Sequence, residues 1–288
     1  MELKSHILEM IRRSTSDLSS DVVDALSNAI KNEAEGSAAK NALNTIMENI
    51  ELARSQSTPI CQDTGALIFY IDYPAGGKEK DFITPIEEAV KEATQKQYLR
   101  PNSVDPVTGK NTGNNVGVNA PYIHFHQWDK DYIQIRFMQK GGGCENCGNQ
   151  YKLPDIPLHA GRDLKGVRKV VLDAVNSAQG QGCAPGIIGV GIGGDRALSH
   201  ILAKEQLFRK VGERSSNPEI AELEKELLND INKLGIGPMG FGGKTTALDV
   251  LIGVQNRHPA TYYVSIAYMC WADRRKTIII KGNEVSYA

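Results

Sequence analysis

The hydrophobic pattern of the chain changes its period near residue 57, and this change constrains the fold more than any other feature. Residues 2–56 carry apolar side chains at helical spacing, with no stretch of period-two alternation, which predicts three helices. After this block, strand-length apolar segments alternate with helical segments and glycine-rich loops. We therefore expect an α/β (mixed α+β) fold with two lobes. We expect residues 1–56 to form a helical N-terminal block and residues 57–288 to form a mixed region continuous with it.

Local signals in the mixed region predict individual elements. Thr84 and Pro85 resemble an N-cap followed by proline in the first turn, and Glu87 completes a capping box for a helix that runs to about Tyr98. Two segments rich in aromatic and β-branched residues, 122–128 and 132–138, flank a turn-like tripeptide and predict an antiparallel hairpin. The long Asn/Gly-rich loop between the helix and this pair, residues 101–120, has a length typical of functional loops.

Composition excludes several classes of protein. The 288 residues are 41% hydrophobic and 23% charged, as in ordinary globular proteins, which excludes a fibrous or wholly disordered chain. The formal net charge is -1, so there is no electrostatic reason to expect a nucleic acid or a membrane surface as partner. No apolar run approaches the roughly 18 residues that span a bilayer, and the N-terminus lacks a cleavable signal pattern. We expect a cytoplasmic protein.

Two glycine-rich segments resemble nucleotide or phosphate sites only in part. Residues 189–194, GVGIGG, match G-x-G-x-x-G, but the polar loop 212–216 stands where a dinucleotide fold needs an acidic residue at the end of a strand. Close packing of a strand on a helix is the favoured interpretation. Residues 240–245, GFGGKT, resemble a phosphate-binding loop, yet Pro238 stands where that motif needs glycine. Anion binding through backbone N–H groups and a tight turn both stay open for this loop.

Five cysteines are the main candidates for chemistry. Their odd number and wide spacing favour reduced thiols or metal ligands over a disulfide framework. Cys61, Cys183 and Cys270 each lie in a loop at the end of an apolar segment, whereas Cys144 and Cys147 form a C-x-x-C without the second ligand pair of a structural zinc site. Two interpretations remain open from the residues alone. Either three loop cysteines hold an iron–sulfur cluster that leaves one iron without a protein ligand, or most of the five are buried thiols.

Several segments after residue 58 resemble the alpha subunit, or N-terminal catalytic half, of the iron–sulfur hydro-lyases, namely class I fumarate hydratase and the related L-tartrate dehydratase. The similar runs are PICQDTG (59–65), LRPNSV (99–104), TGKNTG (108–113), GGGCEN (141–146), GVGIGG (189–194), LGIGPMGFGGKTTALDV (234–250), RHPA (257–260) and YMCWADRR (268–275). The resemblance identifies residues 57–288 as the catalytic region of this family. It implies reversible hydration of fumarate to L-malate, a lyase reaction of the tricarboxylic acid cycle.

The resemblance also implies a cofactor. Cys61, Cys183 and Cys270 would each ligate one iron of a [4Fe-4S] cluster, and the fourth iron would stay open to a hydroxy dicarboxylate. An open iron of this kind is a Lewis acid that makes hydroxide a better leaving group.

Further site residues follow from the same motifs. Gln62 and Asp63 resemble the pair that contacts substrate, with Asp63 as proton donor to the departing oxygen, and Arg100 would clamp a substrate carboxylate. The remaining expected contacts are a close approach of the backbone at Gly142 and Gly143, a contact of His258 with the polar end of the substrate, and charge pairing by Lys244.

Two departures from the family pattern affect these expectations. Some relatives have serine where Cys144 stands, so Cys144 and Cys147 receive no ligand role. The chain ends at Ala288, whereas single-chain members of the family continue into a second domain that carries further substrate-binding arginines and a proton-abstracting threonine. The resemblance therefore implies a separate beta subunit and an α2β2 assembly.

Other functions remain as alternatives. The L-tartrate dehydratase alpha subunit fits the same cluster motifs, because its substrate differs from malate by one hydroxyl. A metal-binding protein without catalysis would use Cys144 and Cys147 as its main site, and a nucleotide-binding module would use residues 189–194.

Overall fold

The computed structural model describes residues 3–288, which fold into two compact units. The first unit comprises Met1–Ser19, Glu48–Gly142 and Ala272–Ala288, and the second comprises Ser20–Met47 and Gly143–Trp271. Met1 and Glu2, with which the predicted helical block begins, lie outside the described residues. The boundary proposed near residue 57 stays a prediction.

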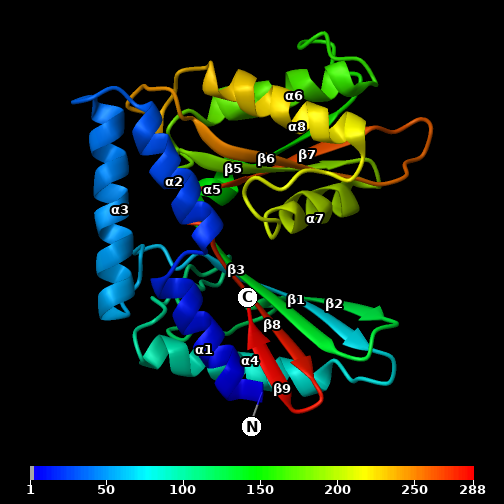
Figure 1. Ribbon diagram of the computed structural model, residues 1–288. Helices are drawn as coiled ribbons and strands as arrows, with labels where there is room; N and C mark the ends of the chain where they lie inside the picture. The colour runs from blue at the N-terminus through cyan, green and yellow to red at the C-terminus, as the bar shows by residue number, and fades with distance from the viewer. Residues whose placement is uncertain (1–2) are drawn as a thin grey trace. The chain divides into compact units, whose positions relative to one another are not determined.

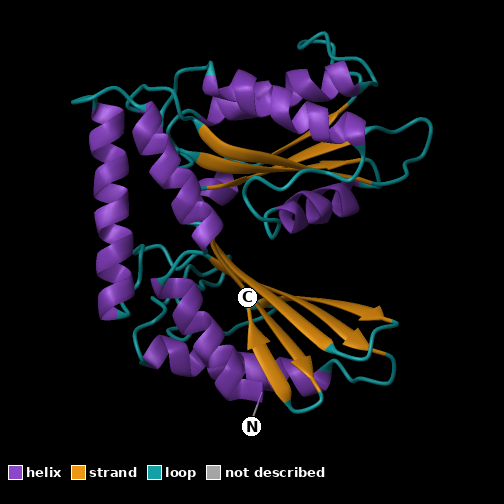
Figure 2. Ribbon diagram, viewed as in Figure 1, coloured by secondary structure: helices purple, strands orange, loops and turns teal. Residues whose placement is uncertain are grey.

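Helices and strands alternate as the sequence pattern predicts (Figure 2). The predicted N-terminal helices are α1 (Leu3–Ser16), α2 (Ser20–Asn32) and α3 (Ala38–Gln56). The remaining elements are, in order, β1 (Ala66–Pro74), α4 (Lys80–Gln95), β2 (Tyr122–Trp128), β3 (Ile133–Lys140), α5 (Gly142–Asn146), β4 (Asn149–Lys152), α6 (Leu164–Ala178), β5 (Gly186–Ile192), α7 (Arg196–Gln206), α8 (Pro218–Asn232), the 3₁₀ turn η1 (Pro238–Gly240), β6 (Ala247–Val254), β7 (Tyr263–Met269), β8 (Arg274–Lys281) and β9 (Glu284–Tyr287). The mixed α+β class expected from the sequence is confirmed.

The first unit is one mixed sheet with helices on one face. Its strand order is β2-β1-β3-β8-β9, in which only the β1–β2 pair is parallel. Alternate residues of β1 and β3, among them Phe69, Ile71 and Phe137, are fully buried in a core against α1 and α4. Figure 1 shows these two helices along the same face of the sheet.

The hairpin predicted for residues 122–128 and 132–138 is wrong, although both segments are strands. β1 lies between them and pairs with β2 in parallel and with β3 antiparallel. Residues 67–73 of β1 are buried throughout, which is the pattern of a strand with neighbours on both sides. The more apolar strand β1 therefore lies between β2 and β3, and the two segments that follow it in sequence are separated.

The helix start predicted at Thr84 is also wrong. α4 begins at Lys80, with Glu79 as N-cap, and Pro85 lies inside the helix. Phe82 is 4% exposed and continues the buried stripe of Ile86 and the later apolar residues by one turn towards the N-terminus. Burial of this aromatic side chain outweighs the local preference for a cap at Thr84.

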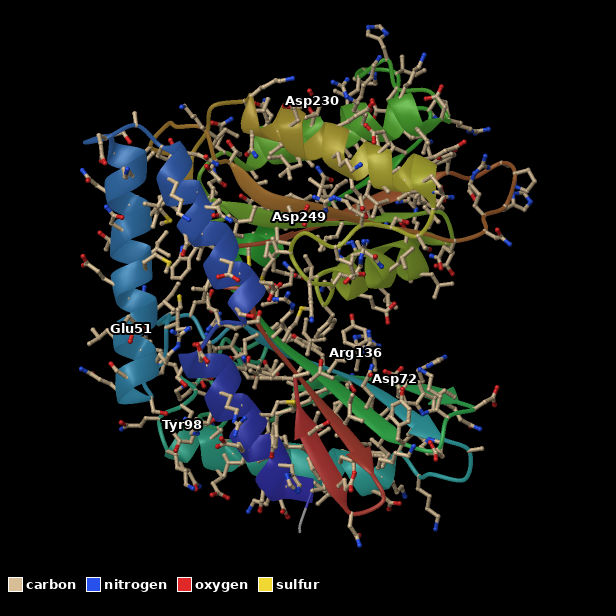
Figure 3. The ribbon with its side chains drawn as sticks, in the orientation of Figure 1. Glu51, Asp72, Tyr98, Arg136, Asp230 and Asp249 are labelled. Carbon is tan, nitrogen blue, oxygen red and sulfur yellow. The ribbon has the colours of Figure 1, made fainter. Side chains whose placement is uncertain are left out.

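The face of this sheet away from α1 and α4 carries a polar network. The Asp72 carboxylate, 7% exposed, lies 3.2 Å from an Arg136 guanidinium nitrogen, and His126 and Gln134 also contact it at 3.2 Å. Figure 3 shows Asp72 and Arg136 on neighbouring strands of the sheet. These contacts join β1, β2 and β3, and two of these strands, β1 and β3, carry the first group of candidate site residues beside their ends.

The second unit is a mixed sheet with helices on both faces. Its strand order is β4-β7-β5-β6, with β5 and β6 parallel and the other pairs antiparallel. Figure 1 shows α6 and α8 on one face of this sheet and α7 on the other. Asp163, Asp195 and Asn217 cap α6, α7 and α8 by accepting backbone N–H groups. Within residues 3–288, no helix has the length and apolar character that crossing a membrane requires.

Candidate active site

The strand pairing of the first unit brings predicted site residues to one end of its sheet. Cys61 and Asp63 immediately precede β1, and Gly142 follows β3. Because β1 and β3 are antiparallel, with Ala66 opposite Lys140, the segment that enters β1 lies beside the segment that leaves β3. Gly65 makes this close approach possible, since a Cβ at Gly65 would lie 2.5 Å from the Lys140 carbonyl oxygen.

Asp63 is the centre of this first group. Its Oδ1 accepts the backbone N–H of Gly65 at 2.8 Å and the side-chain amide of Asn102 at 3.2 Å, and its Oδ2 accepts the N–H of Gly142 at 2.7 Å. The Asp63 N–H in turn lies 3.4 Å from the Cys61 sulfur. The carboxylate therefore caps a local turn and also joins the Cys61 segment to Gly142.

The Asn/Gly-rich loop supplies residues that sequence reasoning did not assign. Arg100 donates its backbone N–H to the Thr64 hydroxyl at 2.7 Å and leaves its side chain exposed. The buried Asn115 accepts the Asn102 N–H at 2.7 Å and donates to the Arg100 carbonyl at 3.0 Å. Asn102 and Asn115 thus hold the loop against the Cys61 segment. The expectation of a functional loop pointed to this region, but not to the asparagines.

Cys183 and Cys270 lie together at one end of the sheet in the second unit. Cys183 precedes β5 and Cys270 follows β7, and these strands are antiparallel, with Ile187 opposite Met269. The backbone N–H of Trp271 donates to the Cys183 carbonyl at 3.3 Å, which ties the two loops together. Cys183 has φ +54°, a conformation that L-residues adopt rarely, and its side chain is exposed.

A buried tyrosine packs against the Cys183 loop. A Cβ at Gly182 or Gly186 would lie 2.4 or 2.6 Å from the ring of Tyr268, so both flanking positions must be glycine for the ring to fit. Burial raises the pKa of the Tyr268 phenol, and electrostatic interactions with Cys147, Cys270, Cys144 and Cys183 add to the shift. All four cysteines of the second unit therefore contribute to the electrostatic surroundings of this phenol.

The C-x-x-C reaches this place through the same topology. Cys144 and Cys147 lie in and after α5, which immediately precedes β4, and β4 is antiparallel to β7. Gly143 comes close to the Cys183 loop, since a Cβ there would lie 3.4 Å from the Gln181 carbonyl oxygen. Among residues 3–288, the structure has all five cysteines outside disulfides.

Lys244 lies in the glycine-rich loop before β6. The anion that this loop binds is a carboxylate of the protein itself. The Glu33 carboxylate accepts the backbone N–H groups of Lys244 and Thr245 at 2.9 and 2.8 Å. An external phosphate would need these same N–H groups. The exposed Lys244 also lines a cavity of about 480 Å³ with Asn28 and Asn232.

The GVGIGG segment serves packing, as the favoured interpretation predicts. A Cβ at Gly189 or Gly191 would lie 2.2 or 2.1 Å from backbone carbonyl oxygens of α7. The N–H groups of Gly193 and Gly194 donate to the carbonyls of Tyr263 and Asn256. Because these N–H groups already have protein partners, the segment lacks the donors that would bind a pyrophosphate.

His258 is the predicted site residue that the second unit does not bring to Cys183 and Cys270. It lies in the loop between β6 and β7, before β7 begins, whereas Cys270 follows the end of β7. Seven residues of strand separate the two positions, which is about 20 Å. His258 is exposed, and its Nδ1 accepts the Ala260 N–H at 3.1 Å.

The donor set of the second unit fits an iron–sulfur cluster in its chemistry. Cysteine thiolates are the usual ligands of such clusters, and two of the three predicted ones lie at one end of one sheet. Cys61 belongs to the first unit, so convergence of all three stays a prediction. Within the described residues, no group of three or more His, Cys, Asp or Glu side chains is arranged around a single metal ion.

Comparison with known proteins gives a consistent family. The family model described as fumarate hydratase (Fumerase) matches residues 4–279. A Geobacillus stearothermophilus protein named as a class I fumarate hydratase is 47% identical over 285 residues, which are 98% of this chain and 55% of that protein. The chain thus spans about half the length of this relative.

Two shorter relatives match along most of their length. A Methanocaldococcus jannaschii protein named as an L(+)-tartrate dehydratase subunit alpha is 40% identical over 287 residues, 98% of each chain. The L(+)-tartrate dehydratase subunit alpha of Escherichia coli K12 is 33% identical over 271 residues, 91% of this chain and 86% of that one.

Proposed function

The chain belongs to the fumarate hydratase (Fumerase) family, and from that premise we propose that it is the alpha subunit of an iron–sulfur hydro-lyase that converts fumarate and L-malate reversibly. The observation that carries the proposal is the position of Cys183 and Cys270 at one end of one sheet, with their loops joined by the Trp271–Cys183 hydrogen bond. Together with Cys61, these thiolates would hold a [4Fe-4S] cluster.

The chemistry divides between the cofactor and the chain. When bound, such a cluster supplies a Lewis-acidic iron that favours departure of a hydroxyl group. Arg100 would bind a substrate carboxylate with its exposed guanidinium, which suits bidentate recognition. Asp63 would transfer a proton to or from the departing oxygen, and its bond to Gly142 would hold it in place. Gln62, Gly143 and Lys244 are proposed as further substrate contacts, whereas His258 lies at the opposite end of the sheet from Cys270 and receives no substrate role.

The partner follows from the relatives of similar length. Both are named as alpha subunits, so we propose that this chain works with a separate beta subunit, in an α2β2 assembly. The beta subunit would complete the substrate site. A cytoplasmic location is part of the same proposal.

L-tartrate dehydratase is the second candidate activity, because the relatives that match along nearly their whole length carry that name. Fumarate hydratase stands first because of the 47% identity to the Geobacillus relative. Assay of the chain, supplied with the unmatched part of that relative or with a beta subunit, using L-malate and L-tartrate separates the two. Faster turnover of tartrate would reverse the order.

The cofactor is tested by anaerobic reconstitution of the full chain with ferrous iron and sulfide, followed by iron and sulfide analysis and absorbance spectroscopy. We expect Cys61→Ala, Cys183→Ala and Cys270→Ala each to abolish stable cluster binding. The double variant Cys144→Ala, Cys147→Ala is the matched control and retains the cluster. Cluster loss in the control together with retention in the other three would favour a metal-binding protein centred on the C-x-x-C.

A further inference from the structure

The glycine-rich loop before β6 closes around a carboxylate from the N-terminal part of the second unit. Glu33, directly after α2, is 5% exposed. Its Oε1 accepts the Lys244 and Thr245 N–H groups at 2.9 and 2.8 Å, and its Oε2 lies 3.1 Å from the Lys244 nitrogen. Gly243 packs directly on this carboxylate, since a Cβ there would lie 2.9 Å from Oε2. Consecutive backbone N–H groups that face an anion form a typical anion-binding turn.

The same loop is bonded to the Cys183 loop. The Met239 N–H donates to the Ala184 carbonyl at 2.8 Å, and the Gly186 N–H donates to the Thr246 carbonyl at 3.0 Å. The two loops also touch at Gly180 and Gly240, where a Cβ on Gly180 would lie 2.8 Å from the Gly240 Cα. Each side of Cys183 therefore has a backbone contact with residues 239–246.

The left-handed backbone of this loop needs an external restraint. Met239, Gly240, Gly242 and Gly243 have φ between +54° and +127°. Glycine lowers the strain of such a backbone conformation. It also gives the unfolded loop many other backbone conformations, so the folded one is entropically costly. The buried carboxylate of Glu33 satisfies two adjacent N–H groups at the C-terminal end of this loop, and charge-assisted bonds of this kind are among the stronger hydrogen bonds in proteins.

From this geometry we infer that Glu33 is a positioning residue for Cys183: its carboxylate serves as the internal anion of residues 239–245 and, through that loop, holds the Cys183 loop in the conformation that ligates the cluster. Only the role of Cys183 as a cluster ligand rests on the proposed function. The coupling of Glu33 to the Cys183 loop is a property of the polypeptide and can be measured without cofactor.

Hydrogen exchange of the full chain without cofactor tests the coupling. In Glu33→Ala, we expect exchange at the Lys244 and Thr245 amides to accelerate about tenfold or more, because their acceptor is lost. Exchange at Met239, Gly186 and Trp271 should also accelerate, since these amides lie on the path to Cys183. Acceleration confined to Lys244 and Thr245 would overturn the inference, because Glu33 would then act only locally.

Chemical rescue separates a positioning role from general destabilisation. Formate is small enough to occupy the space of the missing carboxylate, so it should restore protection at Met239 and Gly186 in Glu33→Ala, whereas chloride at equal ionic strength should not. No rescue by formate, in a variant with wild-type circular dichroism, counts against the inference. If Glu33→Ala does not fold, Glu33→Gln serves as the test variant. Its carboxamide keeps the shape of the carboxylate, but it replaces one acceptor oxygen by an NH₂ group, which cannot accept from the backbone N–H groups. We expect Glu33→Gln to lose part of the protection.

A matched control and a second readout complete the experiment. Glu35→Gln removes a carboxylate that is 86% exposed and lies 2.9 Å from the Lys40 ammonium, and it should leave every one of these amides unchanged. In reconstituted protein, iron release to a chelator should be several-fold faster in Glu33→Ala than in the wild type. If iron release is unchanged in Glu33→Ala, Glu33 affects only the protein without cofactor, and its role in holding the cluster ligand is overturned. A wild-type chain that takes up no iron and sulfide would instead refute the proposed function, while the exchange result would still decide the coupling.

Discussion

The Oδ2 atom of Asp63 accepts the backbone N–H of Gly142 at 2.7 Å, across 79 residues of sequence. This bond exists because β1 and β3 are antiparallel neighbours, so the residues before one strand lie beside those after the other. Gly142 and Gly143 are consecutive, and Gly143 packs on the Cys183 loop in the second unit. One carboxylate therefore orders the Cys61 segment and also holds Gly142, the last residue of this part of the first unit.

Replacement of Asp63 by alanine removes the acceptor of three N–H donors. We expect Asp63→Ala to lower the free energy of unfolding by about 1–3 kcal/mol, because the Gly65, Asn102 and Gly142 donors lose a charged partner. Urea denaturation measures this change. Asp105→Ala is the matched control, since Asp105 also accepts several bonds but lies in an exposed loop, and it should cost less. An equal loss in both variants would contradict the central position of Asp63.

Because Tyr268 packs against two glycines, we predict that the stability losses of substitutions at Gly186 and Tyr268 are not additive. A Cβ on Gly186 would overlap the Tyr268 ring, so Gly186→Ala should destabilise the protein by about 1–3 kcal/mol and disturb the Cys183 loop. Tyr268→Leu provides space for the new methyl group. We therefore expect the double variant to lose less stability than the sum of the single variants, as measured by thermal denaturation. Strict additivity would show that the ring and the glycine do not share this space.

We predict that the GVGIGG segment does not bind a nucleotide and that substitution of its packed glycines destabilises the protein. In Gly191→Ala, the new Cβ would meet the backbone oxygen of Ser199 at 2.1 Å, and no side-chain rotation relieves this overlap. We expect a loss of about 3 kcal/mol or more. Gly253→Ala is the control against the same helix, because its Cβ would meet the flexible end of Gln206 and should cost less. Titration of the wild type with a dinucleotide should show no binding, and saturable binding would refute the packing interpretation.

A carboxylate on α1 predicts a defined loss of stability in acid. Hydrogen bonds from Arg12 and Arg13 lower the pKa of Glu9 from 4.5 to about 2. Since the pKa is lower in the folded state, folding favours the ionised form, so the stabilisation is complete above pH 4.5 and disappears as the pH falls through about 2. The difference in melting temperature between wild type and Glu9→Gln should shrink over this interval. Glu284→Gln, at an exposed position, should show no comparable trend, and a constant difference for Glu9→Gln would contradict the assignment.

Local sequence signals predicted the elements better than their pairing. Hydrophobic periodicity placed the three N-terminal helices. The hairpin of residues 122–128 and 132–138 was wrong because strand order depends on which strand is buried on both sides. That property belongs to the whole sheet. The start of α4 was wrong for a related reason, since burial of Phe82 extends the helix beyond the local cap signal.

Motifs identified the candidate residues, but only the fold determined which of them lie at the same end of a sheet. Cys144, Cys147, Cys183, Cys270 and Lys244 lie at the same end of one sheet, because the segments that carry them enter or leave its strands there. His258 follows a strand at the opposite end, and no feature of its local sequence distinguishes the two ends. Glu33 carries no motif at all, and its contact with the loop of Lys244 links residues 211 positions apart.

The amino-acid sequence determined by itself the family, the cysteines and the class of fold, because motifs and periodicity are properties of short segments. The tertiary structure decided which of these segments meet. Strand order and direction arise from the burial of whole sheets, and a carboxylate such as Glu33 finds its donors only after two distant segments have packed.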